Sequence, residues 1–467
     1  MTLFAEVAVW QPLLGSIVIG LAVWAVWREL EVRLVLFTAA LALGAIALNP
    51  QAIVREFLAT FTNEKFIIPL CCGMGFARVL THTGCDQHLV HLLVRPLTYV
   101  RFLLIPGTVI VGFLVNMPIV SQTSTAVTIG FVVIPLLRAA RLSPVTIGSA
   151  LLLGCSIGGE LLNPGAPELL TTITESQKAA KRLPELGHDP SAYDSARCVR
   201  RIAPLNFIGL TAATLVFWWL ASRYERRLPP SDNETDASPA EEAFQVNWFK
   251  AAVPLVPLVF LYLCSYPFEL LHLDAAWLES GEPTGRYQTR LIGFAMLLGV
   301  VVAALTAPSK LKDTASVFCE GAGYGFAHIV SLIVAATCFG TAVKEIGIAA
   351  IIGRIVQTWP GLLIPGAGFL SLGFAALCGS GMATAQSLFG FFAEPALRVN
   401  MDPTHVGAVV SLAAAAGRTM SPVSAVCVMC ARMTGTKPLE LSKQVVLPLL
   451  ISVAIIVIVA MIIVPTL

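Results

Sequence analysis

The sequence has little charge. Only 12% of its 467 residues are Asp, Glu, Lys or Arg, and 56% are hydrophobic. Soluble domains are about 25% charged, so a soluble class is excluded. Several apolar runs reach the roughly 20 residues that a helix needs to cross a bilayer. The period-two alternation of outer-membrane barrel strands is absent. Together these features predict an all-α polytopic membrane protein.

Other absences narrow the function. The net charge is only +2 and no basic stripe interleaves with aromatics, so no nucleic-acid partner is expected. The sequence has no phosphate-binding Gly loop, no metalloprotease motif and no nucleophile–base arrangement, which argues against an ATP-driven pump and against an enzyme. Cys427 and Cys430 have metal-binding spacing but no second pair. We interpret them as helix-packing residues and expect no metal and no cofactor.

A polar, Pro- and Ser-rich stretch divides the chain into two halves. We assign residues 1–30 to a first transmembrane helix, 31–225 to repeat 1, 226–248 to a polar cytoplasmic linker, 249–289 to a connecting helix with an outer loop, and 290–467 to repeat 2.

Each half contains two interrupted apolar elements. In the first half, Phe102–Met117 and Thr125–Leu137 are each short for a full crossing and meet at a polar tip. We therefore expect re-entrant hairpins at about 101–138 and 362–398, and discontinuous helices at about 145–175 and 405–432.

The two halves resemble each other in sequence. Leu103-Leu104-Ile105-Pro106-Gly107 recurs 259 residues later as Leu362-Leu363-Ile364-Pro365-Gly366. The same offset takes Ser121 to Ser380 and Thr125 to Thr384. Internal repeats of this kind mark secondary transporters, whose binding sites lie between the repeats.

Basic residues in the short connections predict about ten crossings with both termini outside. The first hairpin then enters from the cytoplasm and the second from outside, so the repeats have inverted topology. The exception is the segment 175–201, which carries six basic residues on the outer side.

Arg418 is the sharpest candidate site residue, because an arginine at mid-membrane must face protein, water or an anion. Its planar guanidinium suits a substrate carboxylate. It could equally pair with Glu160, which lies near the repeat-related position, and both arrangements could alternate. Glu160 is also a candidate proton carrier, with a helix cap or an ion pair as the alternative.

Hydroxyl and amide groups surround these breaks. We interpret them as ligands for a carboxylate or for Na⁺ rather than as small residues that only allow close packing of helices. The candidate substrate-binding residues are Arg418, Ser421, Thr419, Ser380, Gly381, Thr384, Ser121, Gln122, Thr123, Ser124 and Asn163. The candidate coupling-ion residues are Glu160, Ser121 and Asn163, with H⁺ preferred to Na⁺.

At these stretches the chain resembles the anaerobic C4-dicarboxylate carriers of the DcuC type. The matching motifs are Thr81-His82-Thr83-Gly84, Gly379-Ser380-Gly381 and Gly417-Arg418-Thr419-Met420-Ser421-Pro422-Val423-Ser424. The resemblance runs from about Phe66 to the C-terminus, except for the linker. It implies transport of fumarate-, malate- or succinate-like dianions by a bacterial inner-membrane protein, with Arg418, Ser421 and Ser380 in the site. The larger group of ion-coupled carriers with paired hairpins often works as dimers, so a homodimer in membrane lipid is a further expectation.

The stretch Gly159-Glu160-Leu161-Leu162-Asn163-Pro164-Gly165 departs from the pattern expected of that family. An additional acid near an anion site favours proton coupling or an amino-bearing substrate. The tips also lack the Asn found in Na⁺-binding relatives. We therefore expect a secondary transporter of small carboxylates, most simply C4-dicarboxylates. The alternatives are a carrier of an amino acid or a monocarboxylate, and a channel.

Overall fold

The chain folds entirely into helices and turns in the part that the structure, a computed structural model, describes. That part comprises residues 10–28, 30–95, 103–227, 245–264, 270–271, 273–278, 287–347 and 358–463. Seven helices in it are long and apolar enough to cross a membrane, or eight if the bent pair within 122–139 counts as one span. The chain is therefore an all-α, multi-pass membrane protein. The expected ten crossings remain a prediction.

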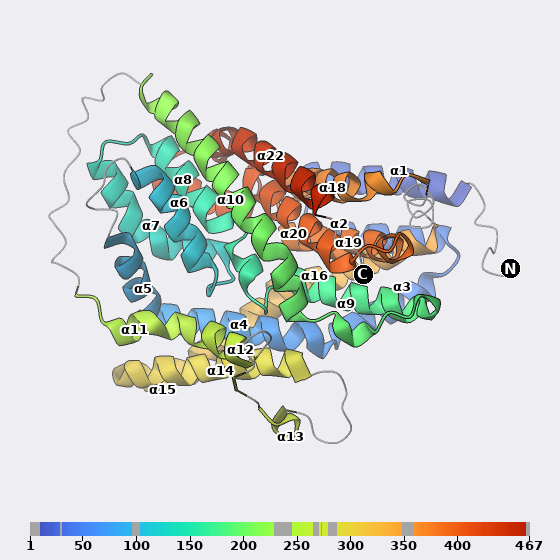
Figure 1. The fold of residues 1–467 in the computed structure, drawn as a ribbon, viewed down its shortest axis with the longest axis horizontal. Helices are drawn as coiled ribbons and strands as arrows, with labels where there is room; N and C mark the ends of the chain where they lie inside the picture. Colours follow the sequence, from blue (N-terminus) through green and yellow to red (C-terminus); the bar gives the residue numbers. More distant parts are fainter. Residues whose placement is uncertain are drawn as a thin grey trace.

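Two groups of helices lie outside the centre (Figure 1). In the first, α14 and α15 pack along α4, and these three helices form the lower edge of Figure 1. In the second, α2 and α3 pack against α16, and α1 covers α2. The bounds are α1 Trp10–Trp27, α2 Val32–Ile46, α3 Pro50–Phe61, α4 Glu64–Thr83, α14 Tyr287–Thr306, α15 Leu311–Gly325 and α16 Ser331–Glu345. Shorter helices complete this part: α5 Cys85–Val94, α11 Trp248–Ala252, α12 Val256–Cys264 and α13 Ala275–Leu278.

The centre contains two matching series of helices. The first series is α6 Leu104–Asn116, α7 Gln122–Ala139, α8 Pro144–Ser156, the 3-10 turn η3 Gly159–Leu162, α9 Pro167–Arg182 and α10 Ser195–Glu225. The second is α18 Leu363–Cys378, α19 Gly381–Arg398, α20 Pro403–Met420, α21 Ala425–Thr434 and α22 Pro438–Ile462. Here α6 packs on α8 as α18 packs on α20, and the two series meet where α9 contacts α19 and α10 contacts α22.

Helix boundaries repeat at the offset found in the sequence. The first residues of α6, α7 and α8 lie 259 positions before those of α18, α19 and α20. Helices α7 and α19 also end 259 positions apart. The series diverge later, because two 3-10 turns, Pro184–Leu186 and Pro190–Ala192, separate α9 from α10, whereas α22 begins four residues after α21 ends.

Some boundaries differ from those that the sequence pattern predicts. Gln122, Thr123 and Ser124 belong to the first turn of α7 rather than to an open tip. The break expected around Gly417 begins later, because α20 continues through Arg418 to Met420. Most of the linker assigned to 226–248 falls on residues 228–244, outside the described part.

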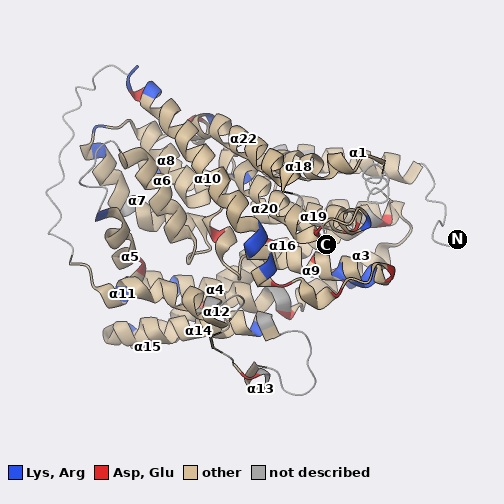
Figure 2. Ribbon diagram, in the orientation of Figure 1, with Lys and Arg blue, Asp and Glu red and all other residues tan. Residues whose placement is uncertain are grey.

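Charged residues are sparse along the helices and gather mainly near their ends (Figure 2). One buried group of charges joins the two series. Asp402 caps α20, accepting from the backbone N–H of Thr404 at 2.9 Å. The same carboxylate pairs with Arg197 of α10 at 2.9 Å and with Arg201 at 3.3 Å. Because Asp402 is 0% exposed, this clamp fixes α20 against α10 and so positions the far end of α20.

Candidate functional site

Arg418 lies in the last turn of α20, where the helix dipole favours a cation. Its side chain reaches across to the end of α8. Nη2 donates to the carbonyl oxygen of Ser156 at 2.8 Å, and Nε donates to the Ser156 hydroxyl at 3.2 Å. The residue is only 6% exposed, so its charge depends on protein partners for compensation.

Glu160 provides the shortest of these contacts. Its Oε1 accepts from Arg418 Nη2 at 2.6 Å and from Gln122 Nε2 at 2.9 Å. Its backbone N–H donates to the Asn116 side chain at 3.1 Å, which holds η3 against the end of α6. Glu160 is 0% exposed, and its Oε2 has no hydrogen-bond partner among the described residues. The structure thus contains the ion pair that was one of the two alternatives for Arg418.

A second buried carboxylate, Glu168, faces the same arginine. Its Oε1 lies 3.8 Å from Arg418 Nη1, within ion-pair range but beyond hydrogen-bond distance. It follows Pro167 in the first turn of α9, where the helix dipole favours an anion. Its Oε2 also lacks a partner in the described part of the chain. Sequence reasoning missed this residue, although a Pro-Glu pair directly after a helix break was a usable signal.

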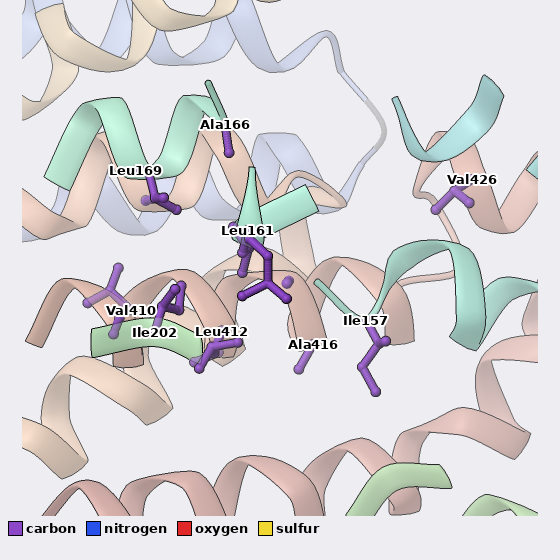
Figure 3. Packing of buried hydrophobic residues seen from close by; sticks show 14 of the residues in the cluster. Ile157, Leu161, Ala166, Leu169, Ile202, Val410, Leu412, Ala416 and Val426 are labelled. Atoms are coloured by element: carbon purple, nitrogen blue, oxygen red, sulfur yellow. The ribbon is translucent and has the colours of Figure 1, made fainter. Parts of the chain in front are cut away.

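We call Arg418, Glu160, Glu168, Ser156 and Gln122 the Arg418 cluster. With all groups ionised it carries two negative charges and one positive charge. Apolar side chains enclose the neighbourhood of the break (Figure 3): they come from Ile157, Leu161, Ala166, Leu169, Ile202, Val410, Leu412, Ala416 and Val426. Little water reaches charges in such surroundings, so their interactions are strong, and one added proton or cation would neutralise the cluster.

The start of α19 approaches the cluster from the other side. A Cβ added at Gly381 would lie 3.2 Å from the Ala414 carbonyl oxygen and 3.3 Å from Arg418 Nη1, so the absence of a side chain lets the start of α19 pack closely against α20 and the arginine. Gly379, the residue that ends α18, has a φ of 68°. This left-handed conformation suits glycine and lets the chain turn between α18 and α19 within two residues.

The two tip serines do the same structural task. Ser121 caps α7 by accepting from the Ser124 backbone N–H at 3.3 Å, and Ser380 caps α19 by accepting from that of Ala383 at 3.2 Å. The Ser124 hydroxyl donates to Ser121 Oγ at 2.9 Å, and Thr123 Oγ1 lies 3.3 Å from the same atom.

The remaining predicted site residues differ in whether their side chains make a hydrogen bond. Thr419 donates to the carbonyl oxygens of Ser156 at 2.8 Å and Ala415 at 2.7 Å. Thr384 donates to the Ser380 carbonyl at 2.8 Å. Asn163 donates to the Met117 carbonyl at 3.0 Å and accepts from the Gly165 N–H at 2.9 Å, so it fastens the break to the first tip. Only Ser421 Oγ, fully buried, has no partner among the described residues.

This arrangement suits the reversible binding of charged groups. Arg418 Nη1 has only the 3.8 Å contact with Glu168, so an incoming anion could replace that contact while Glu160 stays paired with Nη2. Among the described residues, no group of three His, Cys, Asp or Glu side chains could hold a metal ion.

Two family models match the chain. The model described as C4-dicarboxylate anaerobic carrier, DcuC, matches residues 199–465. A model described as Na⁺/H⁺ antiporter family matches residues 66–179. The first match covers more than half of the chain and includes α18 to α22, and the second includes most of the first series with Glu160 and Glu168.

Curated transporters match over large parts of the chain. The anaerobic C4-dicarboxylate transporter DcuC of Escherichia coli K12 is 24% identical over 406 residues, which cover 85% of this chain and 80% of the relative. The corresponding transporter of Vibrio cholerae is 22% identical over 419 residues, or 85% and 81%. An uncharacterised transporter of Haemophilus influenzae is 38% identical over 121 residues, which cover 26% of this chain and 83% of the relative.

Proposed function

Because the chain belongs to the DcuC family of C4-dicarboxylate anaerobic carriers, we propose that it is a secondary active transporter of small carboxylates, with C4-dicarboxylates as its substrates. In this proposal it works by alternating access. The substrate binds between the tips of the α6–α7 and α18–α19 hairpins and the two broken helices, α8–α9 and α20–α21. The bacterial inner membrane is its proposed location, with both termini outside and a homodimer as the working unit.

The observation that carries this proposal is a buried arginine with an exchangeable partner. Arg418 Nη2 is held by Glu160 at 2.6 Å, whereas Nη1 has only the 3.8 Å contact with Glu168. A substrate carboxylate at Nη1 would gain a charge-assisted hydrogen bond. Ser380 and Ser421 lie on the elements that lead to this position and would bind the rest of the substrate.

The inverted arrangement of the halves is part of the proposal. The common offset of the helix starts supports a structural repeat, and the polar tips that interrupt the apolar helices support re-entrant hairpins. Two hairpins that enter from opposite sides would form alternating gates to one central site.

We further propose H⁺ as the coupling ion, in preference to Na⁺. Two carboxylates share one guanidinium, and each has one oxygen without a partner among the described residues. Uptake of one proton makes the cluster neutral, so occupancy by a proton and by a dianionic substrate would be linked. If uptake needs Na⁺ and ignores a pH gradient, the proton version is wrong.

The same two carboxylates favour a second candidate, a carrier of an amino acid. An amino group could pair with Glu160 or Glu168 while the substrate carboxylate binds Arg418. Competition by unlabelled succinate, aspartate and a monocarboxylate against labelled substrate would distinguish these classes.

The test of the function is counterflow exchange in proteoliposomes with wild-type protein, Arg418→Ala and Arg418→Lys. We expect Arg418→Ala to lower dicarboxylate uptake at least about 100-fold, since a buried charge-assisted pair contributes about 3 kcal/mol or more. Arg418→Lys should recover little, because lysine cannot bind a carboxylate in a fork. Arg432→Ala, an exposed arginine on α21, is the matched control. Uptake by Arg418→Ala at the control rate would exclude the anion-site role, and steady conductance without exchange would favour a channel.

A further inference from the structure

We propose that the cleft between α3 and α9 is the port through which the substrate reaches the Arg418 cluster, with Lys181 attracting anions to its mouth. This inference rests on the proposed function and adds an access route on one side of the protein. It also gives a role to basic residues of the segment 175–201, which do not fit the predicted charge bias of the connections.

The cleft is large and continues inward. Its outer part has a volume of about 450 Å³ and lies between the C-terminal end of α3, the first residues of α4 and the outer half of α9. An inner cavity of about 150 Å³ shares Ala59, Asn63, Thr174 and Lys178 with it and extends to α16 and α19. One water molecule needs only about 10–15 Å³ measured in this way, so both parts can hold solvent and a small solute.

Gln386 marks the inner end of this route. Its side chain lines the inner cavity, the residue is 5% exposed, and both its amide oxygen and its amide nitrogen lack hydrogen-bond partners in the described part of the chain. A buried amide in this state costs free energy unless a solute or water binds it. Gln386 lies five residues after Gly381 on α19, or about 7.5 Å along the helix axis. Five residues also turn the helix by about 500°, so Gln386 and Gly381 face different sides of α19, and the cavity reaches α19 between one and two turns from the cluster.

One face of α9 connects the mouth with the cluster. Thr171, Thr174, Lys178 and Lys181 line the two parts of the cleft at spacings of three and four residues, which place them on one side of the helix. Glu168 lies three residues before Thr171 and belongs to the cluster, so the same helix leads from the surface to Arg418.

The charges change along this route. At the mouth, Glu64 is paired with Arg290 and Lys178 with Glu175 at 2.9 Å, which leaves Lys181 as the excess positive charge. Further in, Glu175 and Glu56 line the inner cavity. Figure 2 shows basic and acidic residues side by side at this end of α3 and α9. The mouth of the cleft therefore attracts anions, whereas hydroxyl and amide groups line the inner cavity.

The cleft opens on one side only of the α4 layer. It includes Glu64, the first residue of α4, whereas Lys310 donates to the carbonyl of His82 at the opposite end of that helix at 2.6 Å. The two positions are about 27 Å apart along the axis of α4. Lysines near the second end, such as Lys312, are therefore remote from the port and serve as controls.

The test measures access directly in the variant Thr174→Cys, with the modified site identified by mass spectrometry because native cysteines are present. We expect a small anionic methanethiosulfonate to modify the introduced thiol about fivefold faster than a cationic one of similar size, as one net charge about 8 Å away in a wet cleft would cause. Lys181→Gln should remove most of this preference, and Lys312→Gln should leave it unchanged. A folded variant whose introduced thiol does not react, or reacts faster with the cationic reagent, would overturn the port.

Transport gives the second readout. Modification of the thiol introduced by Thr174→Cys should block uptake, and saturating dicarboxylate should slow the modification. In proteoliposomes, Lys181→Gln should raise KM for a dicarboxylate severalfold with little change in the maximal rate, because steering acts on encounter. A KM equal to that of Lys312→Gln contradicts the steering role. If wild-type protein transports no carboxylate, the proposed function fails, whereas the charge preference of the introduced thiol still decides whether an anion port exists.

Discussion

The two broken helices of the centre are built differently, although their first residues match at one offset. In the second half, α20 continues to Met420 and only four residues, 421–424, separate it from α21. In the first half, α8 already ends at Ser156, and a 3-10 turn occupies part of the ten residues before α9. The first half is therefore interrupted earlier and over a longer stretch.

This difference divides the chemical roles between the halves. The longer helix α20 carries Arg418 across to the first half, and its C-terminal dipole favours the cation. The first half provides the acceptors: the carbonyl of Ser156 at the end of α8, the carboxylate of Glu160 within the break, and the carboxylate of Glu168 in the first turn of α9. An exact structural repeat would have placed like groups opposite each other. The asymmetry produces a buried ion pair between the two series of helices.

The largest difference in stability is expected between the variants Glu160→Gln and Glu168→Gln. Glu160 accepts two hydrogen bonds, one of them from Arg418 at 2.6 Å, so its neutralisation should destabilise the protein by about 3 kcal/mol. Glu168 has only the 3.8 Å contact, and its neutralisation removes a buried charge that is poorly compensated. Glu168→Gln should therefore be neutral or stabilising.

Thermal unfolding of the two variants in detergent measures this difference. We expect the midpoint to fall clearly for Glu160→Gln and to stay or rise for Glu168→Gln. Equal losses would mean that both carboxylates bind Arg418 equally, and the distinction between a tight and a loose partner would be lost. Glu185→Gln, at an exposed acid, controls for removal of charge as such.

A smaller difference in stability is expected between Gly417→Ala and Gly158→Ala, two positions that correspond at the common offset of 259 residues. A Cβ at Gly417 would lie 2.3 Å from the Leu372 carbonyl oxygen, so Gly417→Ala must push α18 and α20 apart and should cost about 2 kcal/mol. Gly158 has a φ of 115° but no atom within 3.0 Å of an added Cβ, so Gly158→Ala should cost about 1 kcal/mol from backbone strain.

Unfolding midpoints again provide the measurement, with uptake as a second readout. Gly20→Ala, where an added Cβ meets nothing within 4 Å, is the control. If Gly158→Ala were the more damaging of the two, the left-handed turn would contribute more to stability than the close contact of α18 with α20.

These two glycines show what a sequence can and cannot predict. A glycine beside a polar stretch predicts a helix end, which is right for Gly158 and wrong for Gly417. Gly417 is helical and owes its identity to the approach of a neighbouring backbone, which depends on tertiary packing. The bounds of α6, α7 and α18, by contrast, lie within three residues of the apolar segments that the sequence predicts, because polar breaks and apolar runs are local features.

In the candidate site, too, the sequence predicts local features but not contacts that depend on tertiary packing. Arg418 and Glu160 stand out as charges inside apolar runs, and an ion pair joins them. Glu168 and Ser156 were missed, since each lies at a helix end that only the position of the break makes important. Asn163 was predicted as a ligand, but both ends of its amide bind the backbone of the first tip and break. Distances across 258 or more residues follow from packing rather than from local pattern.

The smallest expected effect concerns Ser121 and Ser380, which occupy equivalent positions and cap α7 and α19. Replacement of either by Ala should lower stability by about 1 kcal/mol, since each accepts one backbone N–H. Replacement by Asn should keep the cap and the stability. Uptake then separates the two roles. If Ser380→Asn folds like wild type but transports poorly while Ser121→Asn transports normally, the second tip binds substrate and the first does not. Equal uptake by both Asn variants would mean that the two hydroxyls only cap their helices, and the asymmetry of the site would then rest on the Arg418 cluster alone.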